Sequence, residues 1–163
     1  NIIHWMVALF ICSASNAFSQ NTEAEYQKNY NQRIQLERIN DVYIPADLQE
    51  AMSELDRLTD KGTAEKLSLV IEDTVASKLH FSLGRWMSIH WGLEEGSRLS
   101  HYLKQRGLSF PDDMEDLLIR CWHRHIKKMP LNEGDLIERY IDKRKKENEE
   151  RLRKRGKFLP GKE

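Results

Sequence analysis

The sequence predicts an all-α fold: a small helical bundle with an N-terminal signal segment and a projecting, charged C-terminal helix. Apolar residues recur at helical spacing in several segments between Leu48 and Ile126. No segment shows the apolar–polar alternation of a half-buried strand, and none carries a hairpin turn signal. A length of 163 residues suits one modest domain with extensions.

The charge balance limits the classes of partner. The 26 Lys and Arg residues equal the 26 Asp and Glu residues in number. This balance removes the usual argument for binding a nucleic acid or an anionic membrane. No nucleic-acid partner is expected, and another protein is the partner that the first functional hypothesis below considers.

The first twenty residues, "NIIHWMVALFICSASNAFSQ", contain no charged side chain. An apolar run from Ile2 to Cys12 is followed by small residues, with Ala17 and Ser19 where signal peptidase selects small side chains. We therefore expect a signal peptide over residues 1–19 and export to the periplasm or the medium. The run is too short to span a bilayer, so no transmembrane segment is expected after cleavage. An N-terminal buried helix is the alternative.

Two further expectations concern this segment. Because the sequence opens without Met and a basic region, we expect a few residues to precede Asn1. Lipidation of Cys12 is left open, although the bulky Ile11 before it fits a lipobox poorly.

Cys121 is the cysteine that remains after cleavage. A single cysteine forms no internal disulfide, so stability must come from an apolar core. Cys121 is predicted to be a small buried hydrophobe, with a catalytic nucleophile as the alternative.

Residues 20–41 are predicted to form a helical spacer, because Tyr26, Tyr30 and Ile34 make a narrow stripe at i, i+4 and i+8. The helical domain is placed at residues 42–130.

The first half of this domain is predicted to hold three helices. Pro45 suits a first helical turn because its missing N–H costs nothing there. Thr63 can cap a short second helix, and a third is expected to start near Asp73 and run to Trp91. The apolar residues that define these helices are Leu48, Ala51, Met52, Leu55, Leu58, Leu67, Val70, Ile71, Val75, Leu79, Leu83, Trp86, Met87 and Trp91.

The stretch "HWGLEEGSRLSHYL" predicts a corner between two helices. Gly92 can adopt the left-handed conformation that ends a helix. Gly96 restarts the chain, and Ser97 is a suitable N-cap for a helix that ends at Gly107. A nucleophilic serine is not expected here, because capping explains Ser97 and no GxSxG motif is present.

The helix after this corner carries the clearest one-face pattern. Ser109 stands three residues before Asp112, as in a capping box with Asp in place of Glu. Asp112 and Asp113 bring negative charge to a helix N-terminus, which the helix dipole favours, and they complete the predicted structural corner. The apolar face that follows consists of Met114, Leu117, Leu118, Cys121, Trp122 and His125.

Residues 131–163 are predicted to form a charged C-terminal helix and tail with 11 basic and 8 acidic residues. Apolar residues up to Ile141 can pack on the domain, and beyond them we expect the helix to project into solvent. Pairs at i and i+4 such as Glu147–Arg151 contribute about 0.2–0.5 kcal/mol each. A solvated helix is the first interpretation, and a contact with the body or an acidic partner is the alternative.

No metal ion or cofactor is predicted. His123 and His125 lie about 200° apart around a helix, and His80 and His90 diverge as well. No HExxH motif and no close set of Cys and His residues is present.

The segments "SLGRWMSIHWGLEEGSRLSHYL" and "GLSFPDDMEDLLIRCWHRHI" resemble a bacterial helical domain family classed as a domain of unknown function, number 6794 of that series. The resemblance covers about residues 42–126 and implies a helical fold and a domain boundary, but no activity. This sequence departs from the family at Glu94 and at residues 88–90. The matching positions are Leu83, Gly84, Trp86, Trp91, Gly92, Leu93, Gly96, Ser97, Arg98, Leu99, Pro111, Asp112, Asp113, Met114, His123 and Arg124.

The first functional hypothesis is an exported, non-enzymatic protein-interaction module. Its surface would centre on Trp91, Arg98 and Tyr102, since Trp and Arg dominate binding hot spots. Core packing is the default interpretation of the tryptophans. Arg98 is expected to bridge the corner to Asp112 and Asp113.

The second hypothesis is a small hydrolase or metal-dependent enzyme that uses Glu94, Glu95, Asp112, Asp113 and His101. Paired carboxylates can supply an acid and a base. Nothing in the sequence predicts a raised pKa for these carboxyl groups. A purely structural envelope protein is the third possibility.

Overall fold

The computed structural model describes residues 23–158, with side chains described up to residue 156. The predicted signal peptide over residues 1–19, with Cys12, lies outside the described residues. The described part is mostly helical, as the sequence predicts. Its elements are β1 (Arg38–Ile39), β2 (Val42–Tyr43), α2 (Leu48–Leu58), α3 (Lys61–Ser68), α4 (Glu72–Leu79), the π-helix η1 (His80–Gly84), α5 (Arg85–His90), α6 (Arg98–Gln105), α7 (Pro111–Ile126) and α8 (Glu133–Phe158).

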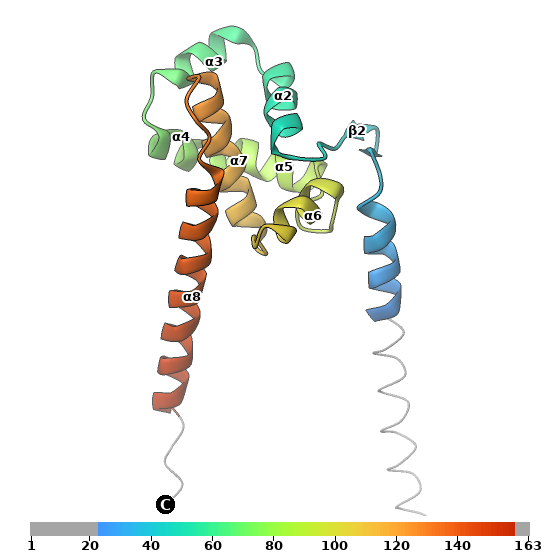
Figure 1. Ribbon diagram of the computed structural model, residues 1–163, viewed down its shortest axis with the longest axis vertical. Coiled ribbons are helices and arrows are strands. Elements are labelled where there is room, and N and C mark those ends of the chain that lie inside the picture. Colours follow the sequence, from blue (N-terminus) through green and yellow to red (C-terminus); the bar gives the residue numbers. More distant parts are fainter. Residues whose placement is uncertain (1–22, 159–163) are drawn as a thin grey trace, which may run out of the picture.

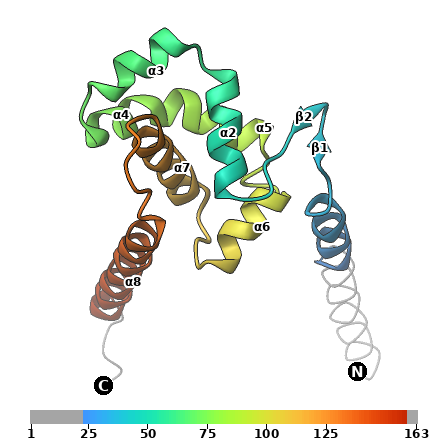
Figure 2. The same cartoon turned by 45° about the horizontal axis from the view of Figure 1, so that its top comes forward.

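α7 is the central helix of the body. The elements from α2 to α6 and α8 all contact it, and α2, α4 and α6 lie around it in both views (Figures 1 and 2). Nine of its 16 residues are buried, so the helix is enclosed on more than one face. Burial of large side chains such as Leu117 and Trp122 stabilises the fold by about 1.5–3 kcal/mol each.

Residues 23–33 and α8 leave the body in the same direction (Figure 1). Leu136 and Ile137 attach the start of α8 to the body. Residues 145–156 are exposed throughout. In the described part of the chain, no helix combines the length and apolar character needed to cross a membrane.

A short antiparallel hairpin precedes α2, although the sequence analysis found no hairpin signal. Arg38 pairs with Tyr43 and Ile39 with Val42. Between them, Asn40 and Asp41 have positive φ angles of 48° and 65°, as a two-residue type I′ turn requires. Asn and Asp tolerate this conformation, so the dipeptide was the missed signal. The predicted helical spacer over 20–41 is thus helical only at residues 23–33 within the described chain.

Three helix starts differ from the predicted ones. Asp47 caps α2, with its Oδ1 accepting from Glu50 N at 2.9 Å, so Pro45 precedes the helix. Asp60 rather than Thr63 caps α3. In both cases an aspartate supplies the cap: Asp47 lies two residues after Pro45, and Asp60 lies one turn before Thr63.

The start of α7 also differs from the predicted capping box at Ser109. Phe110 is the N-cap residue and no side chain caps the helix. Pro111 occupies the first turn, where its fixed φ suits a helix and its missing N–H leaves no donor unpaired.

The long helix predicted from Asp73 to Trp91 is interrupted. α4 begins at Glu72 and continues into η1, a π-helical insertion over five residues, before α5 resumes α-helical geometry. An insertion of this kind adds a residue to one turn and changes which side chains face the neighbouring helix. The π-helical insertion therefore brings His80 and Gly84 to the side of the helix that faces α7.

Candidate functional site

The corner from His90 to Leu103 has the turn geometry that its glycines and serines favour. Gly92 and Gly96 have φ angles of +63° and +103°. Ser97 caps α6: its Oγ accepts from Ser100 N at 3.2 Å, and its own N donates to Ser100 Oγ at 2.8 Å. Ser100 thus completes a reciprocal capping box in the place that Glu or Gln usually fills.

Trp91 is fully buried, which corrects the expectation that it belongs to a binding surface. Its indole packs edge-to-face against Trp86, with ring centroids 5.8 Å apart. Such a pair adds about 0.5–1.5 kcal/mol to the gain from burial. Trp91 therefore stabilises the body and is not accessible to a partner.

Arg98 joins the corner to β2 and α2, not to Asp112 and Asp113 as expected. Its Nε donates to the Ile44 carbonyl at 2.6 Å, and its guanidinium lies 5.0 Å from the Tyr43 ring centroid. Asp113 is instead held by a residue of α8, described below. Arg98 is thus a structural bridge between segments 54 residues apart in the sequence.

Glu50 completes this bridge. Tyr43 Oη donates to Glu50 Oε2 at 2.7 Å, and Ala46 N donates to the same oxygen at 2.8 Å. Arg98 Nη2 lies 3.5 Å from it. The hydrogen bond from Tyr43, followed by that from Ala46, lowers the pKa of the Glu50 carboxyl below its ordinary value.

The outer side of the corner is covered by the chain's own residues 23–33. Arg33 Nε donates to the Gly96 carbonyl at 2.9 Å, and Arg33 Nη2 lies 3.0 Å from Glu95 Oε2. Tyr30 Oη lies 3.1 Å from His101 Nδ1. A Cβ at position 96 would come within 2.5 Å of the Tyr30 ring, so glycine is needed there for space as well as for φ.

Tyr102 is the third residue of the predicted surface, and it is half-buried. The guanidinium of Arg106 lies 4.3 Å from its ring centroid. Of the three expected residues, Trp91 is therefore fully buried and Arg98 bridges two segments, whereas Tyr102 does neither.

The five residues of the enzyme hypothesis do not share one site, although Asp112, which is exposed, and Asp113 are adjacent in the first turn of α7. Glu94 is exposed, Glu95 pairs with Arg33, and His101 contacts Tyr30. Asp113 is buried in an ion pair on α7. These five side chains therefore do not come together as an acid–base pair or as a set of metal ligands.

Cys121 is buried, as expected for a small hydrophobe. Burial raises the pKa of its thiol to about 12, because a thiolate is poorly solvated in the core. The nucleophilic thiolate form is therefore disfavoured at neutral pH.

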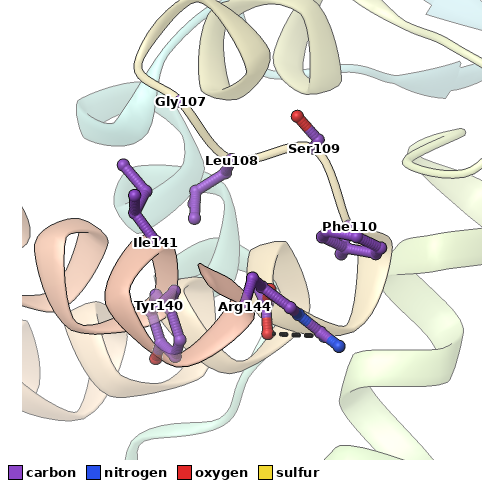
Figure 3. A pocket seen from close by; sticks show the side chains of 8 residues that line it. Gly107, Leu108, Ser109, Phe110, Tyr140, Ile141 and Arg144 are labelled. Carbon is purple, nitrogen blue, oxygen red and sulfur yellow. Dashed lines mark hydrogen bonds and ion pairs between the residues drawn. The ribbon is translucent and has the colours of Figure 1, made fainter. Parts of the chain in front are cut away.

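The start of α8 is attached beside the N-terminus of α7. Arg144 forms a two-pronged ion pair with Asp113, with N–O distances of 2.7 and 2.8 Å, and its guanidinium lies 4.2 Å from the Phe110 ring centroid. The pocket between this part of α8 and the loop at residues 107–110 measures about 110 Å³ (Figure 3). Ligand sites usually enclose about 300 Å³ or more, so this pocket is too small for such a role.

A network of charges that the sequence analysis missed joins α7 to α4. Arg124 binds Glu72 through Nε at 2.6 Å and Nη2 at 2.9 Å. Arg120 contacts Asp116 at 2.7 Å and Asp73 at 2.6 Å. Only the i, i+4 spacing of Asp116 and Arg120 was visible in the sequence.

The structure also brings together a group that sequence spacing did not reveal. His80 of η1 and Asp112 and Glu115 of α7 each offer a ligand atom, and these atoms all lie within 4.8 Å of one another. The expectation of no metal site rested on the spacing of the histidines and on the absence of HExxH and Cys/His motifs, and it did not pair His80 with a carboxylate. The carboxylates that approach His80 are about thirty residues away in the sequence.

Comparison with known proteins gives one match. A family model described as Domain of unknown function (DUF6794) matches residues 44–126. This confirms the resemblance drawn from the sequence, with nearly the same bounds. No curated protein and no solved structure matches the chain.

Proposed function

The chain belongs to the DUF6794 family over residues 44–126, and because that description names no activity, we propose a function from the chain's own geometry. The protein is exported and binds another protein without catalysing a reaction. The contact is made by residues 145–156, which we call the distal arm of α8. The observation that carries this proposal is the exposure of the whole arm beyond its attachment at Arg144.

The distal arm has a composition suited to an acidic partner. It carries six Lys and Arg residues against three Asp and Glu residues. Its one large apolar side chain, Leu152, is 54% exposed and has no core to enter. Exposed basic residues raise the rate of encounter with a negatively charged surface, and a central apolar side chain can supply the contact that is buried on binding.

The attachment of α8 supports this role because it fixes where the arm points. Arg144 is held by Asp113, and Tyr140 donates a hydrogen bond to Asp116. A short helix alone in water is marginally stable, but one continued from a packed segment avoids the cost of nucleation. The arm is thereby preorganised, which reduces the entropy lost on binding.

Export is the second part of the proposal. It is supported by the uncharged apolar run and the small residues at Ala17 and Ser19. A nucleic-acid partner is disfavoured for an exported protein whose basic residues alternate with acidic ones.

Export is tested by fusing residues 1–22, behind a start codon, to alkaline phosphatase, which is active only outside the cytoplasm. We expect an active fusion whose N-terminus after processing is Gln20. An inactive fusion that keeps all its residues would contradict the proposal.

Partner binding is tested by placing a photo-crosslinking amino acid at Leu152 in intact cells. The matched control is Ile89 of α5, an apolar residue of similar exposure on the body. We expect one discrete adduct from position 152 and none from position 89. The adduct should disappear when Lys145, Lys146 and Arg151 are replaced by Glu. Equal labelling at both positions, or none at 152, would reject the arm as the contact.

A further inference from the structure

Three potential metal ligands converge between η1 and α7. His80 is the first residue of η1, and Asp112 and Glu115 are three residues apart in the first turns of α7. Side chains at i and i+3 lie on one face of a helix, so both carboxylates point toward the same neighbour. Their ligand atoms and one His80 nitrogen are all within 4.8 Å of one another.

Glu115 is the unusual member of this group. Its side chain is 6% exposed, yet its carboxylate makes no hydrogen bond within the described part of the chain. His80 Nδ1 lies 3.7 Å from Glu115 Oε2, which is longer than a hydrogen bond. A buried carboxylate without close partners is costly, so a positive charge at this point would be strongly stabilising.

Gly84 leaves space for this carboxylate. A Cβ at position 84 would lie 2.9 Å from Glu115 Oε2, so any other residue would displace it. Glycine inside a helix costs about 1 kcal/mol relative to alanine. π-helical insertions such as η1 occur often at functional sites, and this one places His80 and Gly84 against the same side chain.

The cations around the group form their ion pairs with other carboxylates. His80 and Asp112 line an open groove of about 540 Å³, together with Arg120, Lys143 and Arg144. Arg144 is paired with Asp113, and Arg120 with Asp116 and Asp73. Lys143 Nζ lies 4.0 Å from Glu147. The groove is open at His80 and Asp112, so a hydrated ion can approach the group from that side.

We propose that His80, Asp112 and Glu115 bind a divalent transition-metal ion of the zinc type at the junction of η1 and α7. One imidazole and two carboxylates suit zinc and its first-row neighbours, whereas magnesium and calcium prefer oxygen ligands alone. Three protein ligands leave a position for water.

The ligand atoms must draw closer on binding. Bonds of about 2.0–2.2 Å to a tetrahedral ion place ligand atoms roughly 3.3 Å apart. Asp112 is exposed and His80 is half-buried, so both side chains can rotate inward by the required amount. The ring of Phe81 lies edge-on to the His80 imidazole, with centroids 4.9 Å apart, and limits the directions in which it can turn.

The test is a calorimetric titration of the full chain with Zn²⁺ alone, repeated with Co²⁺ to record its visible absorption. We expect one ion per chain and a cobalt spectrum typical of four-coordinate nitrogen and oxygen ligation. Asp112→Asn, Glu115→Gln and His80→Gln should each weaken binding at least about tenfold, since a direct ligand matters no less than the groups that hydrogen-bond to ligands, whose loss costs about 10–100-fold.

The matched control is His125→Gln. His125 also faces a carboxylate, Asp56 at 2.8 Å, but no third ligand is grouped with them among the described residues. This variant should bind zinc as the wild type does. Asp112→Asn changes an exposed side chain, so its fold is expected to be intact and circular dichroism checks this. Absence of stoichiometric binding, or equal affinity in Asp112→Asn and the wild type, would overturn the site.

Discussion

The corner at His90–Leu103 and the cluster of His80, Asp112 and Glu115 differ in how far apart their residues lie in the sequence. The corner gathers Trp, Gly, Glu, Arg and His within fourteen consecutive residues, and its side chains are used in caps, turns and bridges to β2, α2 and residues 23–33. The cluster joins His80 of η1 to Asp112 and Glu115 of α7, more than thirty residues later, and leaves a buried carboxylate without hydrogen bonds in the described chain.

Unusual residues that lie close together in sequence often form hydrogen bonds with one another's backbone groups, as caps and turns do. A group whose members meet only through tertiary packing has no such local explanation. Substitutions in the corner should therefore change stability, whereas substitutions in the cluster should change zinc binding.

The largest effect is expected from Trp91→Ala in the corner. Removal of a fully buried tryptophan leaves a cavity and should lower the free energy of unfolding by about 3–5 kcal/mol. Urea denaturation followed by circular dichroism measures this loss. A change below about 1 kcal/mol would mean that Trp91 is not a core residue, and would return it to the candidate surface.

The next effect belongs to the cluster. At a free Zn²⁺ concentration one hundred times its dissociation constant, binding should add about 2.7 kcal/mol to the free energy of unfolding. A chelator should reverse the gain, and Asp112→Asn should abolish most of it. Thermal denaturation with and without zinc tests this; the same gain in Asp112→Asn would place the ion elsewhere.

Arg98→Ala should lower the free energy of unfolding by about 1.5–3 kcal/mol, because the Ile44 carbonyl loses a charged donor. Arg98→Lys should recover little of it, since lysine lacks the planar group that lies against Tyr43. Neither variant should alter zinc affinity. A change in zinc affinity without a loss of stability would argue against a scaffold role.

Gly96→Ala should cost about 1–3 kcal/mol, because φ is +103° and the new methyl group meets Tyr30. In the background of Tyr30→Ala the additional loss should be smaller, since only the strain in φ remains. Urea denaturation of the four proteins in this cycle separates the two contributions. Identical losses in both backgrounds would show that residues 23–33 do not lie on the corner in solution.

The smallest effect concerns pH. The pKa of Glu50 is lowered in the folded state, chiefly by the hydrogen bond from Tyr43. Its stabilising contribution is therefore present above the unfolded-state pKa near 4.5 and is lost as the pH falls through the lower folded-state pKa. The difference in unfolding free energy between the wild type and Glu50→Gln should shrink below about pH 4, which acid titration at fixed urea can measure.

The helical parts of the fold could be predicted where a local rule decides the outcome. The apolar face of α7 follows from i, i+3 and i+4 spacing, and the start of α6 follows from the hydrogen bonding of Ser97. Gly92 ends its helix because it tolerates a positive φ. These features depend on residues within one or two turns of each other.

Other features depend on packing between distant segments and had no local signal. The π-helical insertion at η1 places His80 against α7, which hydrophobic periodicity does not reveal. Arg98 binds the Ile44 carbonyl, a backbone group that no side-chain pattern marks. The hairpin at Asn40–Asp41 is different, because its turn residues were present and were overlooked.

The contacts of residues 23–33 and α8 have a practical consequence for any recombinant fragment trimmed to the family bounds of 44–126. Such a fragment would lack Tyr30 and Arg33, which shield Gly96 and Glu95, and Tyr43, which flanks Arg98. It would also lack Arg144, so the carboxylate of Asp113 would be left uncompensated at the edge of the core. A fragment that keeps these contacts must therefore extend beyond residues 44–126 at both ends.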